Sequence, residues 1–197
     1  LSSLVKPDIG IVTNISGAHL EGFGSIDNIR KEKKSIFNHS KKRYYGDEIE
    51  TLITLSNHPL ANNKVFLKNA SIAYEVCKDF MDKSDQEEFS RIIEDFVLPK
   101  GRGQTYSLSR GIVLIDDTYN ANPESVKAAI DNLARYQTKG RKIFIFGDMK
   151  ELGENAIGFH KEIADYCEGK IDGIICYGDL AKNTFNNSKS IPLSLHF

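Results

Sequence analysis

The feature that most constrains the fold is a regular alternation of short apolar runs and helical patterns in the second half of the chain. The apolar runs cover residues 111–116, 142–146 and 173–177, and patterns typical of amphipathic helices cover 123–136 and 156–167. Strands that alternate with helices favour right-handed βαβ units around a parallel sheet. We therefore expect an α/β fold, to which residues 191–195 could add a further strand.

The first half of the chain is less regular. The run Ile9-Gly10-Ile11-Val12 is typical of a buried parallel strand, for which we expect no neighbouring strand in this chain. Ser25 is a good N-cap for a helix that reaches Phe37. We also expect helices over 60–81 and 84–96, the second capped by Ser84 or Asp85. Polar and apolar residues alternate weakly over 48–55, where we expect a strand.

A linker candidate separates the two halves. Residues 97–103 contain Pro99, Gly101 and Gly103, which interrupt both helical and strand periodicity. We place a domain boundary there, with one domain over 1–97 and another over 98–197.

Composition excludes several classes of protein. The 197 residues carry a formal net charge of −1 with scattered cations, which disfavours a nucleic-acid partner. No apolar run approaches the length of a bilayer span, so we expect no membrane insertion. Three widely spaced cysteines argue against a disulfide framework or a zinc site, and we expect them to be small buried side chains in a reducing cytoplasm.

The most informative polar block runs from Asp116 to Pro123, between an apolar strand and a helical pattern. Open α/β sheets bind ligands at this edge, and a helix N-terminus favours phosphate or carboxylate groups. Asp117 could accept hydrogen bonds from a ribose. The alternative is an Asx-rich turn that only caps the helix, with Asn122 as N-cap and Pro123 in the first turn.

A second block, Thr13 to Gly24, follows the first apolar run and contains His19 and Glu21. Lys33 lies fourteen residues after His19 on the next helix. A carboxylate, an imidazole and water would suit Mg²⁺, but His19 could equally be an ordinary loop residue and Glu21 a solvated one. A third strand-end block, Gly147 to Glu154, is either a ligand loop or a polar turn, and His160 behind it is expected to be a packing or surface residue. No Gly-x-x-x-x-Gly-Lys-Ser/Thr phosphate loop occurs in these 197 residues.

Four ordered motifs together resemble those of the Mur ligases, with the closest match to the MurF-type branch. They are Thr-Asn-Ile-x-x-Ala-His-Leu-Glu-Gly-Phe-Gly, Lys-Gly-Arg, Asp-Asp-Thr-Tyr-Asn-Ala-Asn-Pro and Gly-Asp-Met-x-Glu-Leu-Gly-Glu. The resemblance implies ATP-dependent amide formation in peptidoglycan precursor synthesis. ATP phosphorylates the terminal carboxylate of UDP-MurNAc-tripeptide, and the amine of D-Ala-D-Ala attacks the acyl phosphate.

The resemblance also implies roles for residues at matching positions. His19 resembles a histidine that binds Mg²⁺, and Lys33 resembles a lysine carbamylated by CO₂, whose carbamate helps to hold the metal. Arg102 resembles an arginine that reaches the ATP phosphates, and Asp117 resembles an aspartate on the ATP ribose. The surrounding nucleotide loop would consist of Tyr119, Asn120 and Asn122.

Departures from the family pattern shape the remaining expectations. The family's phosphate loop, its upstream metal-binding glutamate and its uridine-binding domain are not in this sequence. We expect a fragment, inactive by itself: an incomplete central P-loop-type domain followed by a Rossmann-like, truncated C-terminal domain. The full-length protein is expected to be a cytoplasmic monomer. A non-catalytic nucleotide-binding remnant, or a related ligase with another amino-acid acceptor, are the alternatives.

Overall fold

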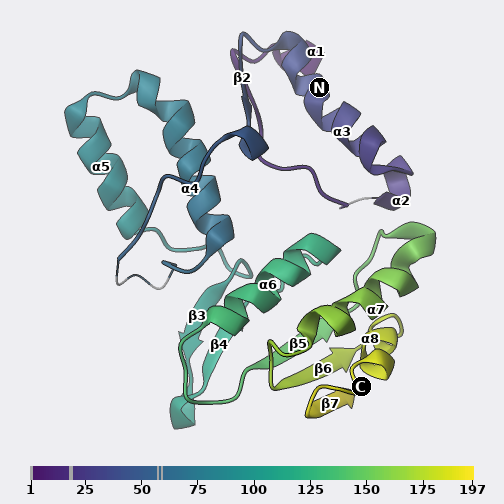
Figure 1. The fold of residues 1–197 in the computed structure, drawn as a ribbon. Coiled ribbons are helices and arrows are strands. Elements are labelled where there is room, and N and C mark those ends of the chain that lie inside the picture. Colours follow the sequence, from purple (N-terminus) through teal and green to yellow (C-terminus); the bar gives the residue numbers. More distant parts are fainter. Residues whose placement is uncertain (1, 18–19, 57, 59) are drawn as a thin grey trace. The chain divides into compact units, whose positions relative to one another are not determined.

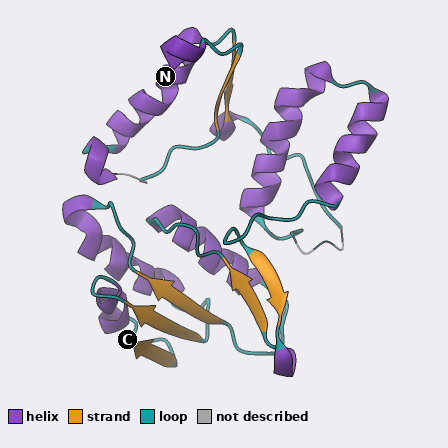
Figure 2. Ribbon diagram, turned by 180° about the vertical axis from the view of Figure 1, so that it is seen from behind, coloured by secondary structure: helices purple, strands orange, loops and turns teal. Residues whose placement is uncertain are grey.

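The computed structural model describes residues 2–17, 20–56, 58 and 60–197. The described residues form two compact units, one built from 1–16 and 23–96 and the other from 17–22 and 97–197. Both contain helices and parallel strand pairs, so the expected α/β class is confirmed (Figures 1 and 2).

The first unit contains a two-stranded parallel sheet. Strand β1 (Ile9–Val12) pairs with β2 (Lys42–Tyr45), in a register that runs from Ile9 opposite Lys42 to Val12 opposite Tyr45. The prediction that the first strand would lack a neighbour is therefore wrong. A search for apolar runs misses β2 because its sequence is Lys-Arg-Tyr-Tyr.

In the chain, helix α3 (Ile26–Lys34) comes between these two strands and follows the short helices α1 (Ser2–Val5) and α2 (Leu20–Phe23). Its predicted cap is confirmed, because the Ser25 hydroxyl accepts a hydrogen bond from the Asn28 N–H at 3.2 Å. The α-helix ends at Lys34 and continues as a 3₁₀ helix over Ser35–His39, so the predicted extension to Phe37 is helical but more tightly wound.

The first unit ends in two longer helices, which begin at other residues than predicted. Helix α4 (Lys64–Cys77) is shorter than the expected 60–81, because Asn63 caps it by accepting from the Phe66 N–H at 3.0 Å. Helix α5 (Lys83–Glu94) is capped by Asp82, which forms a capping box with Asp85.

The strand expected over 48–55 does not form. The backbone N–H groups of Leu52 and Ile53 each donate to the Ser71 hydroxyl of α4 at 2.9 Å. These donors are satisfied by a helix side chain, so this segment contributes no strand to the sheet.

The second unit begins with a β-hairpin that the sequence analysis did not foresee. Strand β3 (Gln104–Ser107) pairs antiparallel with β4 (Val113–Asp116), and Gln104 lies opposite Asp116. The strand predicted over 111–116 thus forms, but it pairs with β3 and not within the parallel sheet. Arg110 and Gly111, with φ of 62° and 71°, turn the chain between the two strands.

The rest of the second unit is a three-stranded parallel sheet with helical connections. Its strands are β5 (Ile143–Gly147), β6 (Gly173–Tyr177) and β7 (Leu193–His196), in that spatial order. Helix α6 (Pro123–Arg135) precedes the sheet, and α7 (Ala156–Cys167) and α8 (Ala181–Asn187) connect its strands. The predicted helices and strands of this region are confirmed, whereas α8 was not expected.

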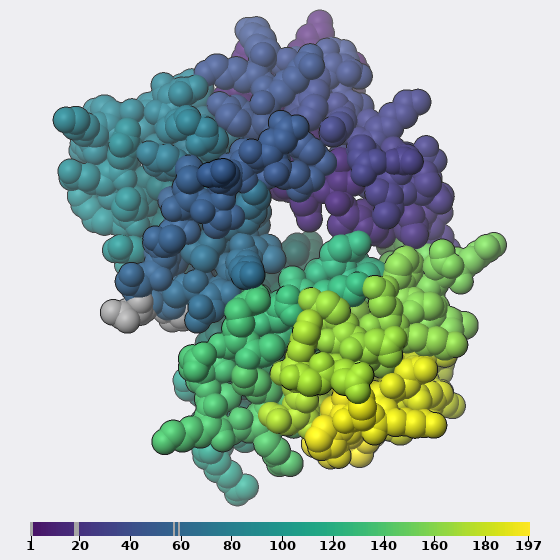
Figure 3. Space-filling model, viewed as in Figure 1, coloured from purple at the N-terminus to yellow at the C-terminus, as the bar shows by residue number. Residues whose placement is uncertain are grey.

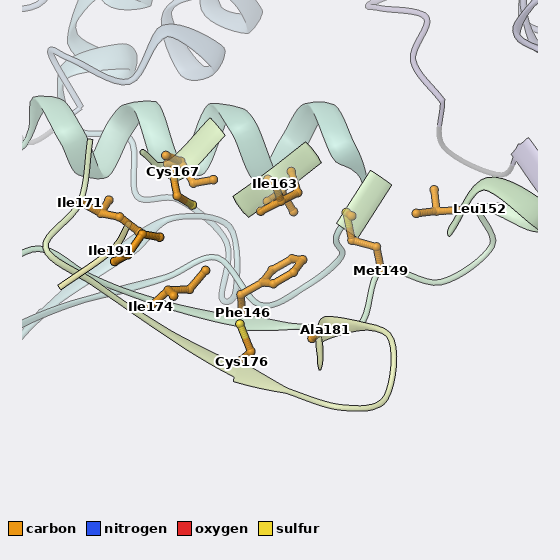
Figure 4. Packing of buried hydrophobic residues seen from close by; sticks show 12 residues of the cluster. Phe146, Met149, Leu152, Ile163, Cys167, Ile171, Ile174, Cys176, Ala181 and Ile191 are labelled. Carbon is orange, nitrogen blue, oxygen red and sulfur yellow. The ribbon is translucent and has the colours of Figure 1, made fainter. Parts of the chain in front are cut away.

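One face of this sheet packs against the helices to form the main core (Figure 4). Phe146, Ile174 and Cys176 are at most 3% exposed and share a buried cluster with side chains of α6, α7 and α8. The opposite face carries Ile145, Ile175 and Leu195 side by side in the strand register, and Ile145 remains 66% exposed. The C-terminal residues, yellow in Figure 3, lie at one side of this unit.

Two of the three cysteines are buried as expected. Cys167 and Cys176 lie in the core, whereas Cys77 at the end of α4 is exposed, so the expectation of burial is wrong for Cys77. Within the described residues, no helix is long and apolar enough to cross a membrane.

Candidate functional site

The β3–β4 hairpin brings two candidate loops of the second unit together. The Gly103 N–H donates to the Asp116 carbonyl at 2.7 Å, and the Tyr119 N–H donates to the Gly101 carbonyl at 3.0 Å. Gly101 has a φ of 74°, and a Cβ there would lie 3.2 Å from the Tyr119 nitrogen. The turn that carries Arg102 is therefore fixed by backbone hydrogen bonds beside the turn that carries Asp117 and Tyr119.

The side chains of these turns form a small cluster of charged and aromatic groups. The Arg102 guanidinium carbon lies 3.7 Å from the centroid of the Tyr119 ring. Desolvation raises the pKa of Asp117; the positive charge of Arg102 opposes the rise and the negative charge of Asp116 adds to it. The hairpin thus places the cation that precedes β3 beside the carboxylate and the aromatic ring that follow β4 and precede the N-terminus of α6.

Other polar groups of this block stabilise the turn itself. One Asp116 carboxylate oxygen accepts from the N–H and hydroxyl of Thr118, at 3.2 and 2.7 Å. Asn120 accepts from the Ala121 N–H at 2.9 Å, and Asn122 accepts from the Ser125 N–H at 2.9 Å as the N-cap of α6. The side-chain oxygens of both predicted nucleotide-loop asparagines are thus used in local structure, as the capping alternative predicted.

The first unit places Lys33 next to the polar segment that follows β1. The Lys33 ammonium donates to the Asn14 carbonyl at 3.2 Å, which ties α3 to that segment. The predicted metal ligand His19 lies outside the described residues. Within the described residues, no three histidine, cysteine, aspartate or glutamate side chains come together as a metal site.

The strand-end block from Gly147 to Glu154 is anchored in the core of the second unit. Asp148 accepts from the Ala181 N–H at 2.8 Å, and Met149 and Leu152 are at most 2% exposed. His160 is fully buried behind this loop and belongs to its support, so it is a packing residue. Glu21 has an exposed side chain, and its N–H donates to the Glu151 carbonyl at 3.1 Å.

Comparison with known protein families identifies the family of the chain. Residues 1–94 match the Mur ligase middle domain, and residues 101–191 match the Mur ligase glutamate ligase domain. The chain belongs to the Mur ligase family. The Arg102, Asp117 and Tyr119 cluster lies within the matched glutamate ligase domain of this Mur ligase, and Lys33 lies within its middle domain.

Two relatives of this chain carry the same protein name. The UDP-N-acetylmuramoyl-tripeptide–D-alanyl-D-alanine ligase of Haemophilus influenzae is 30% identical over 90% of this chain and 48% of the relative. The ligase of that name from Bacillus subtilis is 28% identical over 91% of this chain and 48% of its own length. The chain therefore spans about half the length of these curated relatives.

Solved structures share the fold. MurF from Acinetobacter baumannii superposes with a TM-score of 0.81 at 24% identity, over 99% of this chain and 51% of the other. MurF from Thermotoga maritima, solved in complex with ADP, gives a TM-score of 0.78 at 23% identity, over 100% of this chain and 55% of the other.

The pairing of Arg102 with Tyr119 is the part of the site that the sequence analysis missed. Each residue was a candidate separately, but nothing placed them together. The sequence signal was the pair Thr105 and Tyr106, residue types that favour strands, before the Ser109-Arg110-Gly111 turn. A hairpin in this register necessarily brings the residues before β3 next to those after β4.

Proposed function

We propose that this Mur ligase chain contributes to the ATP-dependent joining of D-Ala-D-Ala to UDP-MurNAc-tripeptide in peptidoglycan precursor synthesis. The observation that carries the proposal is the Arg102, Tyr119 and Asp117 cluster at a strand end, within a chain whose relatives carry the corresponding enzyme name. The ADP bound in the Thermotoga maritima structure supports a nucleotide as ligand of this fold.

The proposed reaction has two steps. The γ-phosphoryl group of ATP passes to the terminal carboxylate of the tripeptide, and the D-Ala-D-Ala amine then attacks the acyl phosphate and releases inorganic phosphate. Arg102 would stabilise the negative charge on the nucleotide phosphates, because guanidinium groups pair with phosphate oxygens. Asp117 would accept hydrogen bonds from the ribose hydroxyls, which requires its carboxylate oxygens to be available. Tyr119, Asn120 and Asn122 would complete the nucleotide loop.

We further propose that His19 and Lys33 hold Mg²⁺, with Lys33 as a carbamate. The donor chemistry fits, since a carbamate would supply the anionic oxygen ligands that Mg²⁺ prefers. Bound Mg²⁺ would supply positive charge beside the phosphates. The Asn14 carbonyl, which holds the Lys33 nitrogen at 3.2 Å, would position the modified side chain.

Several attributes of the full-length protein belong to the same proposal. Residues 1–97 would be part of the central ATPase domain and residues 98–197 part of the C-terminal domain. The full-length protein would be a cytoplasmic monomer that inserts in no membrane and binds no nucleic acid. The 197-residue chain would be inactive without the phosphate loop that its own sequence does not contain.

A phosphate-release assay on the full-length protein tests the activity. The reaction contains ATP, UDP-MurNAc-tripeptide and D-Ala-D-Ala, and each is omitted in turn. We expect release only when all three are present. Release that persists without D-Ala-D-Ala, and that another amino acid stimulates, would reassign the protein to a related ligase. ADP binding with no release under any condition would favour a non-catalytic nucleotide-binding remnant.

A further inference from the structure

The Arg102 guanidinium contacts the Tyr119 ring with its carbon 3.7 Å from the ring centroid. A guanidinium that lies over a ring uses its face, whereas its five N–H donors point outward in its own plane. Within the described part of the chain, no acceptor takes a hydrogen bond from the Arg102 side chain. The donors that suit a phosphate are therefore held in place and still available.

The carboxylate of Asp117 is a competing partner for Arg102, because the charge of Arg102 acts on it. The charge of Arg102 acts on Asp117 and lowers its pKa against the larger effect of desolvation. The two side chains nevertheless form no ion pair with each other. The ion pairs found among the described residues all join other side chains. The Tyr119 ring thus holds the guanidinium outside ion-pair distance of Asp117.

The backbone explains why this arrangement is fixed before any ligand binds. The Tyr119 N–H donates to the Gly101 carbonyl at 3.0 Å, so the residue before Arg102 is tied directly to the residue that carries the ring. Two side chains that start from bonded backbone segments lose less freedom on pairing than two that start from separate loops. The ring and the guanidinium are therefore held as one element.

We propose that Tyr119 is a positioning residue: its ring holds Arg102 away from Asp117, so that the N–H groups of the guanidinium stay free for the diphosphate of a nucleotide. This inference rests on the proposed function, because it takes a nucleoside diphosphate or triphosphate as the ligand. It gives Tyr119 a role through Arg102 and no direct contact with the base. The consequence is that Tyr119 matters for phosphate recognition and not for recognition of the nucleoside.

Calorimetric binding of ADP and of adenosine to the full-length protein tests this role. An exposed cation–π contact is worth about 0.5 to 1 kcal/mol, so Tyr119→Leu should weaken ADP binding about two- to fivefold and leave adenosine binding unchanged. Tyr119→Phe keeps the ring and should retain the affinity for ADP. Tyr106→Leu removes a ring that is 38% exposed on the same hairpin, and serves as the matched control without an effect. In an Arg102→Met background, Tyr119→Leu should have no further effect.

Three outcomes would overturn the proposal and leave the proposed function intact. Equal weakening of adenosine and ADP binding in Tyr119→Leu would show that the ring contacts the nucleoside. Loss of affinity in Tyr119→Phe would assign the effect to the hydroxyl. An undiminished effect of Tyr119→Leu in the Arg102→Met background would show that Tyr119 does not act through Arg102. Failure of the wild-type protein to bind ADP would instead overturn both proposals.

Discussion

The buried imidazole of His160 accepts a hydrogen bond from the backbone N–H of Met149 at 3.0 Å. Its other ring nitrogen lies 2.7 Å from the Ala156 carbonyl, to which it donates as the neutral tautomer. The His160 carbonyl in turn accepts from the buried Thr184 hydroxyl at 2.7 Å. Through its ring and its carbonyl, this one residue thus connects the loop after β5, the first turn of α7 and helix α8.

His160→Leu should destabilise the second unit, because it leaves the buried Met149 N–H without an acceptor. An unsatisfied buried donor costs about 1–3 kcal/mol. The measurement is urea unfolding followed by circular dichroism. Lys161→Leu, at the exposed neighbouring position, is the control and should change the free energy of unfolding by less than about 0.5 kcal/mol. Equal effects of the two variants would contradict the bonding role of His160.

The three cysteines should differ sharply in reactivity toward a thiol-specific colour reagent. Burial raises the pKa of Cys167 to about 12 and that of Cys176 to about 11, and the reactive form of a thiol is the thiolate. Cys77 is exposed and should react alone in the folded protein, with all three reacting after denaturation. Cys77→Ser should abolish the fast reaction, and a fast reaction that survives this change would contradict the burial of the other two.

Asp117 and Asp131 should change stability with pH in opposite directions. Desolvation raises the pKa of Asp117 above 3.8 in the folded state. Ionisation of this carboxyl group therefore opposes folding as the pH rises above 3.8. Asp117→Asn should therefore stabilise the protein at pH 7, by only a few tenths of a kcal/mol because solvent screens the exposed group. The gain should disappear below about pH 3.8, where the carboxyl is protonated in both states.

Asp131 is the opposite case. Burial by itself would raise its pKa, but hydrogen bonds from Lys170 at 3.1 Å and Tyr166 at 3.0 Å outweigh burial and lower it below 3.8. Its contribution to stability is present above pH 3.8 and is lost as the pH falls through the lowered pKa. Asp131→Asn should cost about 1 kcal/mol at pH 7. Unfolding curves of both variants across pH 3–7 check these signs, and parallel curves would contradict them.

Lys33→Ala should lower the activity of the full-length protein on the order of a hundredfold if its carbamate places charge at the metal. Short carboxylates such as formate or acetate should restore part of the activity by replacing the carbamate oxygens. Lys31→Ala, at an exposed position of the same helix, should leave the activity unchanged. Full activity of Lys33→Ala without any additive would contradict the carbamate role.

The sequence predicted the second unit better than the first because its buried strands are apolar and helix α6 begins at a recognisable cap. Asn122 and Pro123 start α6 as predicted, and the Gly173–Tyr177 strand forms over the expected residues. By contrast, β2 owes its place to pairing with β1, since a strand of Lys-Arg-Tyr-Tyr has no apolar pattern. Local sequence cannot reveal a strand whose stability depends on its neighbour.

The candidate site, too, was predicted only in part from the sequence. Asp117 and Tyr119 were identifiable in the polar block after a predicted strand, and Asn122 as a cap, whereas Arg102 was indicated by the resemblance of its Lys-Gly-Arg motif. Their mutual arrangement was not predicted, because it depends on the unforeseen hairpin and on backbone hydrogen bonds between residues thirteen and eighteen positions apart. The roles of His19 and Lys33 as metal ligands remain predictions.

The most direct test of the account is the identity of the product. The full-length protein is incubated with ATP, UDP-MurNAc-tripeptide and D-Ala-D-Ala, and the nucleotide products are analysed by mass spectrometry. We predict UDP-MurNAc-pentapeptide, formed together with ADP and inorganic phosphate in equal amounts. ATP hydrolysis that leaves the tripeptide unextended, or extension by an acceptor other than D-Ala-D-Ala, would contradict the assignment.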